Sequence, residues 1–138
     1  MEITIHSVID NIDPAGLATD EPEINITTLP VTLTRCDGDV LLSYEEEQEG
    51  TKIHTDIIAH SDGAVSLDRR GGVVWCVKFR TGEESRTIYG VPPYSFDCTV
   101  KTKRAETSDT ADGLKIRLVY SMNIGGSEKE VKMRITVK

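Results

Sequence analysis

Residues 64–100 read AVSLDRRGGVVWCVKFRTGEESRTIYGVPPYSFDCTV. Short runs of β-branched and aromatic residues are separated there by turn signals at 70–72 (Arg-Gly-Gly), 81–83 (Thr-Gly-Glu) and 90–93 (Gly-Val-Pro-Pro). Strand-like runs separated by short turns in this way are typical of consecutive antiparallel strands. The stretch therefore predicts an antiparallel meander, and its most apolar face is predicted to lie in the core: Val73, Trp75, Val77 and Phe79.

Alternation of apolar and polar residues continues on both sides of this stretch. It predicts further strands at 2–9, 23–35, 39–49, 51–59, 95–104, 114–122 and 131–137. Pro30 interrupts the second of these and suits an edge strand, a bulge or a bend. Two polar segments, 10–23 and 105–113, are predicted as loops. No segment carries a helical period, so the sequence predicts an all-β fold.

The chain length and the number of strands limit the architecture. With 138 residues the sequence fits one domain, 1–138. About eight to ten strands joined by short turns are expected. Closing such a sheet on itself removes its exposed edges, so we predict a closed or nearly closed antiparallel barrel of the calycin (lipocalin-like) type, with a β-sandwich as the alternative. A barrel of this size holds packed side chains or one small ligand.

The charges are unevenly distributed along the sequence. The net charge is −7, yet residues 1–63 hold 14 acidic against 2 basic residues, and residues 64–138 hold 9 against 14. Such asymmetry has two explanations: acidic strands of the first half pair with basic strands of the second, or a basic outer face meets an anionic partner. The overall acidity argues against nucleic acid as that partner.

Outward positions near the end of the chain form what we call the basic stripe. Either it pairs with Glu45, Glu47 and Glu49 of the acidic run at residues 45–49, or it docks an acidic protein or RNA. The residues of the basic stripe are Lys101, Lys103, Lys115, Arg117, Lys132 and Arg134.

The cysteines and the first residues indicate the cellular compartment. Cys36, Cys76 and Cys98 are odd in number and lack CxxC spacing, which argues against a disulfide framework and a zinc ribbon. Cys76 and Cys98 lie in strand-like runs and are predicted to pack as small apolar residues. The start, MEITIHSVID, is unlike a secretion signal, and no apolar run has the length of a membrane span. The expected location is the cytoplasm.

Period-two geometry predicts charged side chains inside the barrel. Parity with Leu42 and Leu67 directs Glu46 and Arg69 inward. An unpaired charge would be costly there, so the two must pair with each other, meet water or bind a polar group of a ligand. The candidate ligand-binding residues of the interior are Tyr44, Glu46, Arg69, Trp75, Tyr89 and Tyr120.

Several segments together resemble a known bacterial family. They are LSYEEEQEG at 42–50, LDRRG at 67–71, VKF at 77–79 followed by Gly82, YGVPPY at 89–94, and Gly113-Leu114 leading to Tyr120. In this order and spacing the sequence resembles, from Ile3 to Val137, the YwiB-like proteins, a small family of uncharacterised bacterial proteins. Ser95 departs from the pattern, since a glycine is expected there. The resemblance implies a calycin-like β-barrel and supplies no activity.

The sequence favours binding over catalysis. It contains no GxSxG, no HExxH and no phosphate-cradling glycine loop. His6, His54 and His60 lie on different strands or turns and are predicted at the surface, with a metal site of His54, His60 and Asp56 as the alternative. No metal or other cofactor is expected.

Two functions remain open from the sequence. The first is a barrel that binds a small, partly apolar molecule in its interior. The second is a protein-interaction or structural module with a packed interior and a charged outer face. No membrane partner is expected, and a homodimer formed through the edge at Pro30 is a further hypothesis.

Overall fold

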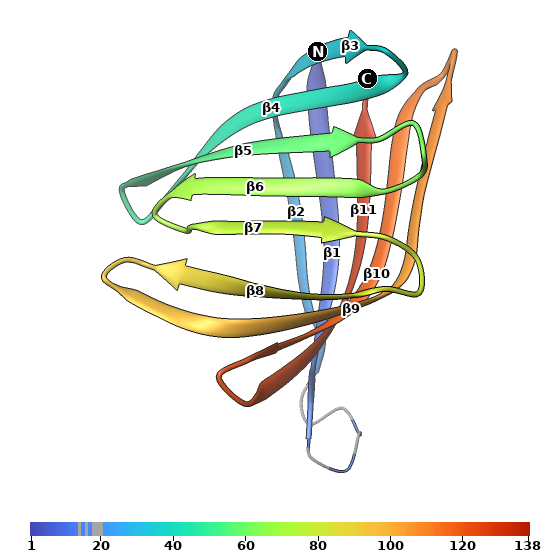
Figure 1. Ribbon diagram of the computed structural model, residues 1–138. Helices are drawn as coiled ribbons and strands as arrows, with labels where there is room; N and C mark the ends of the chain where they lie inside the picture. Colours follow the sequence, from blue (N-terminus) through green and yellow to red (C-terminus); the bar gives the residue numbers. More distant parts are fainter. Residues whose placement is uncertain (14, 16, 18–20) are drawn as a thin grey trace.

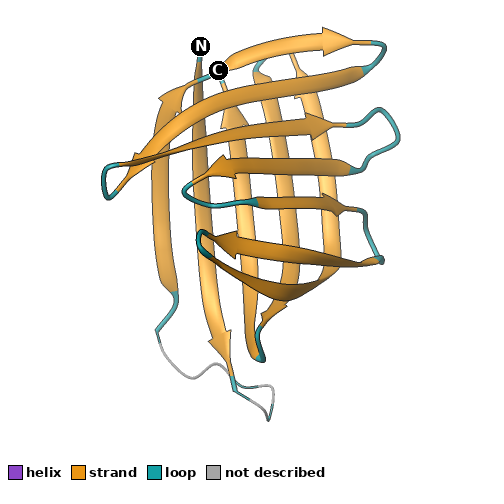
Figure 2. Ribbon diagram, turned by 60° about the vertical axis from the view of Figure 1, so that its left-hand side comes forward, coloured by secondary structure: helices purple, strands orange, loops and turns teal. Residues whose placement is uncertain are grey.

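The computed structural model describes residues 1–13, 15, 17 and 21–138. In this part of the chain all regular secondary structure is β-strand, in eleven strands (Figure 2). None of these residues forms a helix that could cross a membrane. The strands are β1 (Glu2–Ile12), β2 (Glu23–Pro30), β3 (Thr32–Cys36), β4 (Asp39–Gln48), β5 (Thr51–Ala59), β6 (Val65–Gly71), β7 (Trp75–Phe79), β8 (Glu84–Val91), β9 (Tyr94–Thr110), β10 (Gly113–Ile124) and β11 (Ser127–Val137).

The strands form two antiparallel sheets that face each other. The first sheet has the order β2-β1-β11-β10-β9-β8, and the second sheet has the order β3-β4-β5-β6-β7. Figure 1 shows β4 to β7 crossing steeply in front of β1, β2, β10 and β11. An isolated bridge between Val74 and Gly90 links the two sheets beside β7 and β8.

The predicted all-β antiparallel fold is confirmed, with one strand more than the upper number expected. The strand predicted at 23–35 divides after Pro30 into β2 and β3, which are edge strands of different sheets. Pro30 therefore lies on an edge strand, where its missing N–H is tolerated. As far as the chain is described, neither sheet closes on itself through hydrogen bonds. The closed barrel stays a prediction.

β1 and β11 pair along nearly their full lengths. Their register runs from Ile3 opposite Val137 to Ile12 opposite Glu128. The backbones of Glu2 and Lys138 extend it with two mutual hydrogen bonds of 2.9 and 3.0 Å. Figure 1 shows both chain ends at the same end of the first sheet. The first sheet is thus assembled from both the beginning and the end of the chain.

The core lies between the sheets and follows the predicted period of two. β7 alternates buried Trp75, Val77 and Phe79 with exposed Cys76 and Lys78. Burying one large apolar side chain contributes roughly 1.5–3 kcal/mol, so the alternation fixes which face of each strand points inward. β10 buries its whole inner face in the same way: Leu114, Ile116, Leu118, Tyr120 and Met122.

The prediction that Cys76 packs in the core is wrong. Its neighbours Trp75 and Val77 face inward, so the alternation of β7 turns Cys76 to the outside. Cys98 is buried, as predicted.

The loop predicted at 105–113 is also wrong over most of its length. β9 continues to Thr110 and stays paired with β10. The register jumps at Lys103, which has no partner on β10, so a bulge shifts the alternation and directs Ala105 inward. The polar sequence gives no sign of this strand because most side chains of residues 105–110 are exposed.

The other predicted loop, 10–23, is shorter than expected where it is described. Residues 10–12 belong to β1 and pair with β11, and β2 begins at Glu23. Residues 14, 16 and 18–20 lie outside the described residues.

The stretch 64–100 forms β6, β7, β8 and the start of β9, with turns at the predicted places. Gly71 ends β6 with a φ of +112°, a left-handed conformation that glycine adopts readily. A Cβ at this position would collide with the carbonyl oxygen of Lys52 on β5. The glycine therefore allows β5 and β6 to approach closely at this corner.

Candidate functional site

A cavity of about 510 Å³ lies between the two sheets, and strands of both sheets line it. Its volume is within the range of small-molecule sites. All six residues predicted to face the interior line this cavity: Tyr44, Glu46, Arg69, Trp75, Tyr89 and Tyr120. Their interior position is thus observed, whereas their role in binding stays a prediction.

Strand register explains why residues distant in the sequence meet at the cavity. Tyr44 on β4 lies opposite Thr55 on β5, Thr55 lies opposite Arg69 on β6, and Arg69 lies opposite Trp75 on β7. Residues directly opposite one another in antiparallel strands point to the same face. A single row across the second sheet therefore presents a phenol, a hydroxyl, a guanidinium and an indole to the interior.

The two predicted charges of the interior form an ion pair. Arg69 Nη2 donates a hydrogen bond of 2.7 Å to Glu46 Oε1. The two side chains are only 21% and 16% exposed. A guanidinium has five N–H donors. Among the described residues, Arg69 makes one side-chain hydrogen bond, to Glu46. The remaining donors are available to a ligand or to water in the cavity.

Two buried tyrosines place neutral hydroxyl groups beside this ion pair. Burial raises the pKa of Tyr44 to about 12. Burial also raises the pKa of Tyr120, against a smaller lowering by the charge of Arg69. Tyr120 is 3% exposed, and no described residue hydrogen-bonds its hydroxyl. Both phenols are protonated at neutral pH and can each donate or accept a hydrogen bond.

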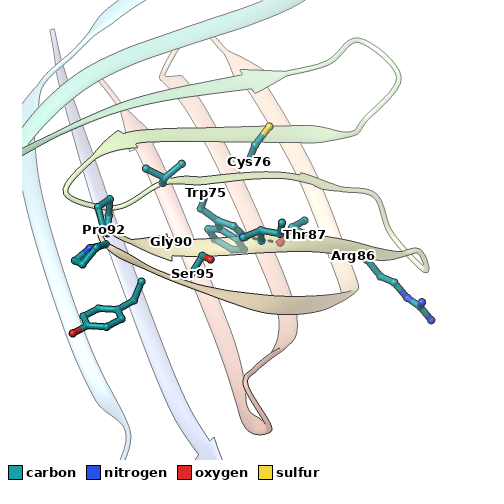
Figure 3. Close-up of a pocket in the computed structure, with 11 residues that line it drawn as sticks. Trp75, Cys76, Arg86, Thr87, Gly90, Pro92 and Ser95 are labelled. Atoms are coloured by element: carbon teal, nitrogen blue, oxygen red, sulfur yellow. Dashed lines mark hydrogen bonds between the residues drawn. The ribbon is translucent and has the colours of Figure 1, made fainter.

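Aromatic rings form one wall of the cavity. Trp75 packs edge-to-face on Tyr89 and on Phe79, with centroid distances of 5.5 and 6.2 Å. Phe79 in turn contacts Tyr120 at 4.6 Å. The indole Nε1 of Trp75 donates a 2.8 Å hydrogen bond to Thr87 Oγ1, which fixes the ring (Figure 3). The wall combines apolar area with few polar atoms, as ligand sites do.

The sequence analysis missed the polar residues that β2 contributes. Glu23, Asn25 and Thr27 line the cavity, while Ile24 and Ile26 point outward and are 60% and 66% exposed. β2 therefore turns its polar face inward, the reverse of a core strand. Its alternation is visible in the sequence, but apolar residues normally mark the inner face, so the pattern alone favours the opposite orientation.

A second hollow, of about 590 Å³, lies outside the core where β7 and β8 diverge (Figure 3). The exposed side chains of Val74, Ile88 and Tyr94 make it apolar. Figure 3 shows Arg86, its charged residue, extending away from it. Ligand sites usually combine apolar walls with several convergent polar groups. The cavity between the sheets satisfies this criterion better.

The described residues contain no group of three or more side chains arranged to hold a metal ion. His54 contacts Asp56 at 3.0 Å and Glu45 at 3.6 Å on the outer face of the second sheet. His60 instead hydrogen-bonds Ser66 at 2.7 Å. The alternative of a joint metal site of His54, His60 and Asp56 is therefore not supported.

Comparisons with known proteins place these features in a family context. A family described as a domain of unknown function, DUF1934, matches residues 16–136. No curated protein matches the chain. The crystal structure of the ywiB protein from Bacillus subtilis is similar in fold, with a TM-score of 0.74, 23% sequence identity and coverage of 99% of this chain and 92% of that chain. The resemblance to the YwiB-like proteins is thereby confirmed.

Proposed function

The chain belongs to the DUF1934 family, a domain of unknown function, and from its interior we propose that it binds a small, partly apolar molecule between its two sheets. The observation that carries the proposal is the cavity of about 510 Å³ lined by residues of both charge and aromatic character. An interior filled by side chains, as a purely structural module would have, would leave no such volume.

We propose further that the two sheets act together as a calycin-like barrel. The bridge between Val74 and Gly90 joins them on one side. Closing a small antiparallel sheet produces an interior that suits one small ligand. In this arrangement β2 and the outer ends of β4 and β11 form the rim, where Glu23, Gln48 and Lys129 line the cavity.

The lining residues support distinct roles. The aromatic wall around Trp75 and Phe79 would cover the apolar part of the ligand. Arg69, with donors left after its bond to Glu46, would bind an acceptor group. Tyr120 would supply a hydroxyl that has no partner among the described residues. We propose binding as the role of this lining, with Glu46 held in its ion pair with Arg69.

Native mass spectrometry of the purified protein tests the proposal directly. We expect a non-covalent adduct that is lost on denaturation, and its mass would identify the ligand class. The same spectrum reports whether the protein is a monomer or a dimer.

A fluorescent probe tests the cavity without knowledge of the natural ligand. We choose anilinonaphthalene sulfonate, which joins an apolar aromatic body to an anionic group. The fluorescence of the dye should increase when the protein is added. The increase should be smaller with Ser7→Phe than with the parent protein, because a phenyl ring at this 8% exposed position fills part of the cavity. Thr4→Phe, on the outer face of the same strand, is the matched control. Equal dye binding by both variants, with both folded, would refute an interior site.

A further inference from the structure

The outer face of the first sheet carries a hollow of about 390 Å³ on the side opposite to the cavity. We call it the basic hollow. Among its lining residues four are permanent cations and one is a histidine, and none of the described lining residues is acidic. The side chains that define it are His6, Val8, Arg104, Arg117, Val119, Lys132 and Arg134.

Strand register brings these cations together in two adjacent rows. In the first row His6 on β1 lies opposite Arg134 on β11, and Arg134 lies opposite Arg117 on β10. In the second row Lys132 lies opposite Val119, and Val119 lies opposite Arg104. Like charges directly opposite one another destabilise a sheet. On β9 the first row ends at Glu106, opposite Arg117, but Glu106 makes its ion pair with Arg104. An added anion would therefore offset the repulsion between Arg117 and Arg134.

The chain itself supplies little of that counter-charge. Within the described residues, Arg104 contacts Glu106 at 3.4 Å and Lys103 contacts Glu130 at 3.3 Å. No ion pair of the described residues involves the other five members of the basic stripe: Lys101, Lys115, Arg117, Lys132 and Arg134. All five are exposed.

The acidic run at residues 45–49, which the sequence offered as a partner, lies elsewhere. It belongs to the hairpin of β4 and β5, whose turn lies at the left in Figure 1, whereas the turn between β9 and β10 lies at the upper right. Glu45 contacts His54 on its own sheet. Glu84 and Glu106 lie opposite Lys101 and Arg117 in register, and Glu130 pairs with Lys103. Within the described residues, Lys115, Lys132 and Arg134 form no ion pair, so pairing within the molecule compensates only part of the basic stripe.

The residues at the bottom of the basic hollow indicate which chemical class of partner it can bind. Val8 and Val119 are half-buried between the cations. An apolar floor within a cationic ring suits an anion that also carries apolar groups. The described lining contains no Phe, Tyr or Trp, and its one ring is the imidazole of His6, whereas sequence-tolerant binding of single-stranded nucleic acid relies on stacking of successive bases on several rings. A peptide that alternates acidic and apolar side chains matches both features.

We propose that the basic hollow binds an acidic segment of a partner protein, with carboxylates on Arg117 and Arg134 and an apolar side chain over Val8 and Val119. Arginine pairs well with carboxylates because its fork of donors matches their two oxygens. This surface is separate from the interior cavity, so either proposal can fail without the other.

Fluorescence anisotropy with synthetic probes tests this. The probe is a labelled peptide that alternates Glu and Val, a Ser-Val peptide is its control, and labelled oligo(dT) tests the nucleic-acid alternative. We expect the Glu-Val peptide to bind and its affinity to fall steeply between about 50 and about 200 mM salt. The variant R117Q/R134Q should weaken binding by about tenfold or more.

The control variant K52Q/K78Q makes the same change of charge on exposed residues of the second sheet. It should leave peptide affinity unchanged. R117Q/R134Q should not lower stability, since it relieves a like-charge pair. The proposal is overturned if the Glu-Val peptide fails to bind at low salt or if both double variants weaken it equally. Tighter binding of oligo(dT), or self-association that R117Q/R134Q abolishes in sedimentation experiments, would replace the partner with nucleic acid or a second copy.

Discussion

Arg69 on β6 reaches diagonally across β5 to Glu46 on β4, with 2.7 Å between Nη2 and Oε1. Thr55, the residue of β5 opposite Arg69, is fully buried beneath this contact. Because both charged side chains are largely buried, each depends on the other for most of its compensation. The ion pair is therefore both a link across three strands and the polar centre of the cavity.

Removing the cation should destabilise the fold. In Arg69→Met the carboxylate of Glu46 loses its partner, so we expect the free energy of unfolding to fall by about 1–3 kcal/mol. The double variant E46Q/R69M should lose less than the sum of the single variants. Urea unfolding of all four proteins measures the coupling. A loss below about 0.5 kcal/mol for Arg69→Met, together with weakened dye binding, would make Arg69 a ligand anchor rather than a structural partner.

The hydrogen bond from Trp75 to Thr87 joins β7 and β8. Among the described residues, one backbone bridge, between Val74 and Gly90, pairs the two sheets beside it. Thr87→Val leaves the indole N–H unsatisfied, so we expect a loss of about 1–2 kcal/mol. Trp75 is the single tryptophan of the sequence, and its fluorescence reports unfolding at this position. Thr99→Val, on the outer face of β9, is the control. Equal stability of the two variants would contradict this account.

Acid should weaken the outer face of the second sheet through Asp56. Partial burial raises the pKa of this carboxyl, but hydrogen bonds from Ser43 and His54 and the charge of Arg70 outweigh it and lower the pKa below the ordinary 3.8. Because its pKa is lowered on folding, ionised Asp56 stabilises the folded state at pH values above 3.8. This stabilisation is lost as the pH falls through the pKa that Asp56 has in the folded protein. Asp68 faces Asp56 in register and adds acidic charge there.

Asp56→Asn should therefore be less stable at neutral pH and lose less stability on acidification. Urea unfolding between about pH 6 and about pH 2 measures both effects. The same slope with pH in the variant and the parent would assign the acid sensitivity to other carboxyls.

Alkaline pH should destabilise the fold through its buried phenols. Burial raises the pKa of Tyr44 to about 12, and it also raises the pKa of Tyr120. In the unfolded chain both ionise near the ordinary value of 10. Stability should thus be intact below pH 10 and fall between 10 and 12. Tyr44→Phe should reduce this fall, which urea unfolding at several pH values between about 9 and about 12 measures. An equal loss of stability in Tyr44→Phe and in the parent protein would contradict the buried environment of Tyr44.

Gly71 should tolerate no side chain. Gly71→Ala adds a strained left-handed conformation and a collision with the carbonyl oxygen of Lys52. Gly82→Ala is the matched control, because its φ is +82° but its Cβ would meet no atom within 4 Å. We expect a loss of about 1–2 kcal/mol for the control and a larger loss for Gly71→Ala. Thermal unfolding compares them, and equal losses would show that the close approach of β5 and β6 is adjustable.

Side-chain parity made much of the interior predictable from the sequence. The apolar stripe of Trp75, Val77 and Phe79 fixes the inner face of β7, and the same period carries Glu46 and Arg69 inward with their apolar neighbours. These predictions succeed because a period of two leaves one choice of face once a strand is anchored by its apolar residues.

Alternation of apolar and polar residues does not predict the inward face of a strand where another interaction determines its orientation. β2 exposes Ile24 and Ile26 because its inner face meets the polar rim of the cavity rather than the core. β9 continues through a polar sequence because its backbone hydrogen bonds to β10 do not depend on the polarity of its exposed side chains. The bulge at Lys103 has no sequence signal such as a glycine. Sheet pairing and cavity position decide these features, and both depend on strands distant in the chain.

The pairing of β1 with β11 also sets the order in which the molecule can be completed. Of the eleven strands described, β1 is synthesised before the others, and its partner in the register from Ile3 to Val137 is synthesised after them. At a synthesis rate of roughly 5–20 residues per second, β1 waits on the order of ten seconds for β11. During that time its edge is an open template for other strands. The last strand therefore serves as the closing element during biosynthesis, and the nascent chain depends on its arrival to avoid misassembly.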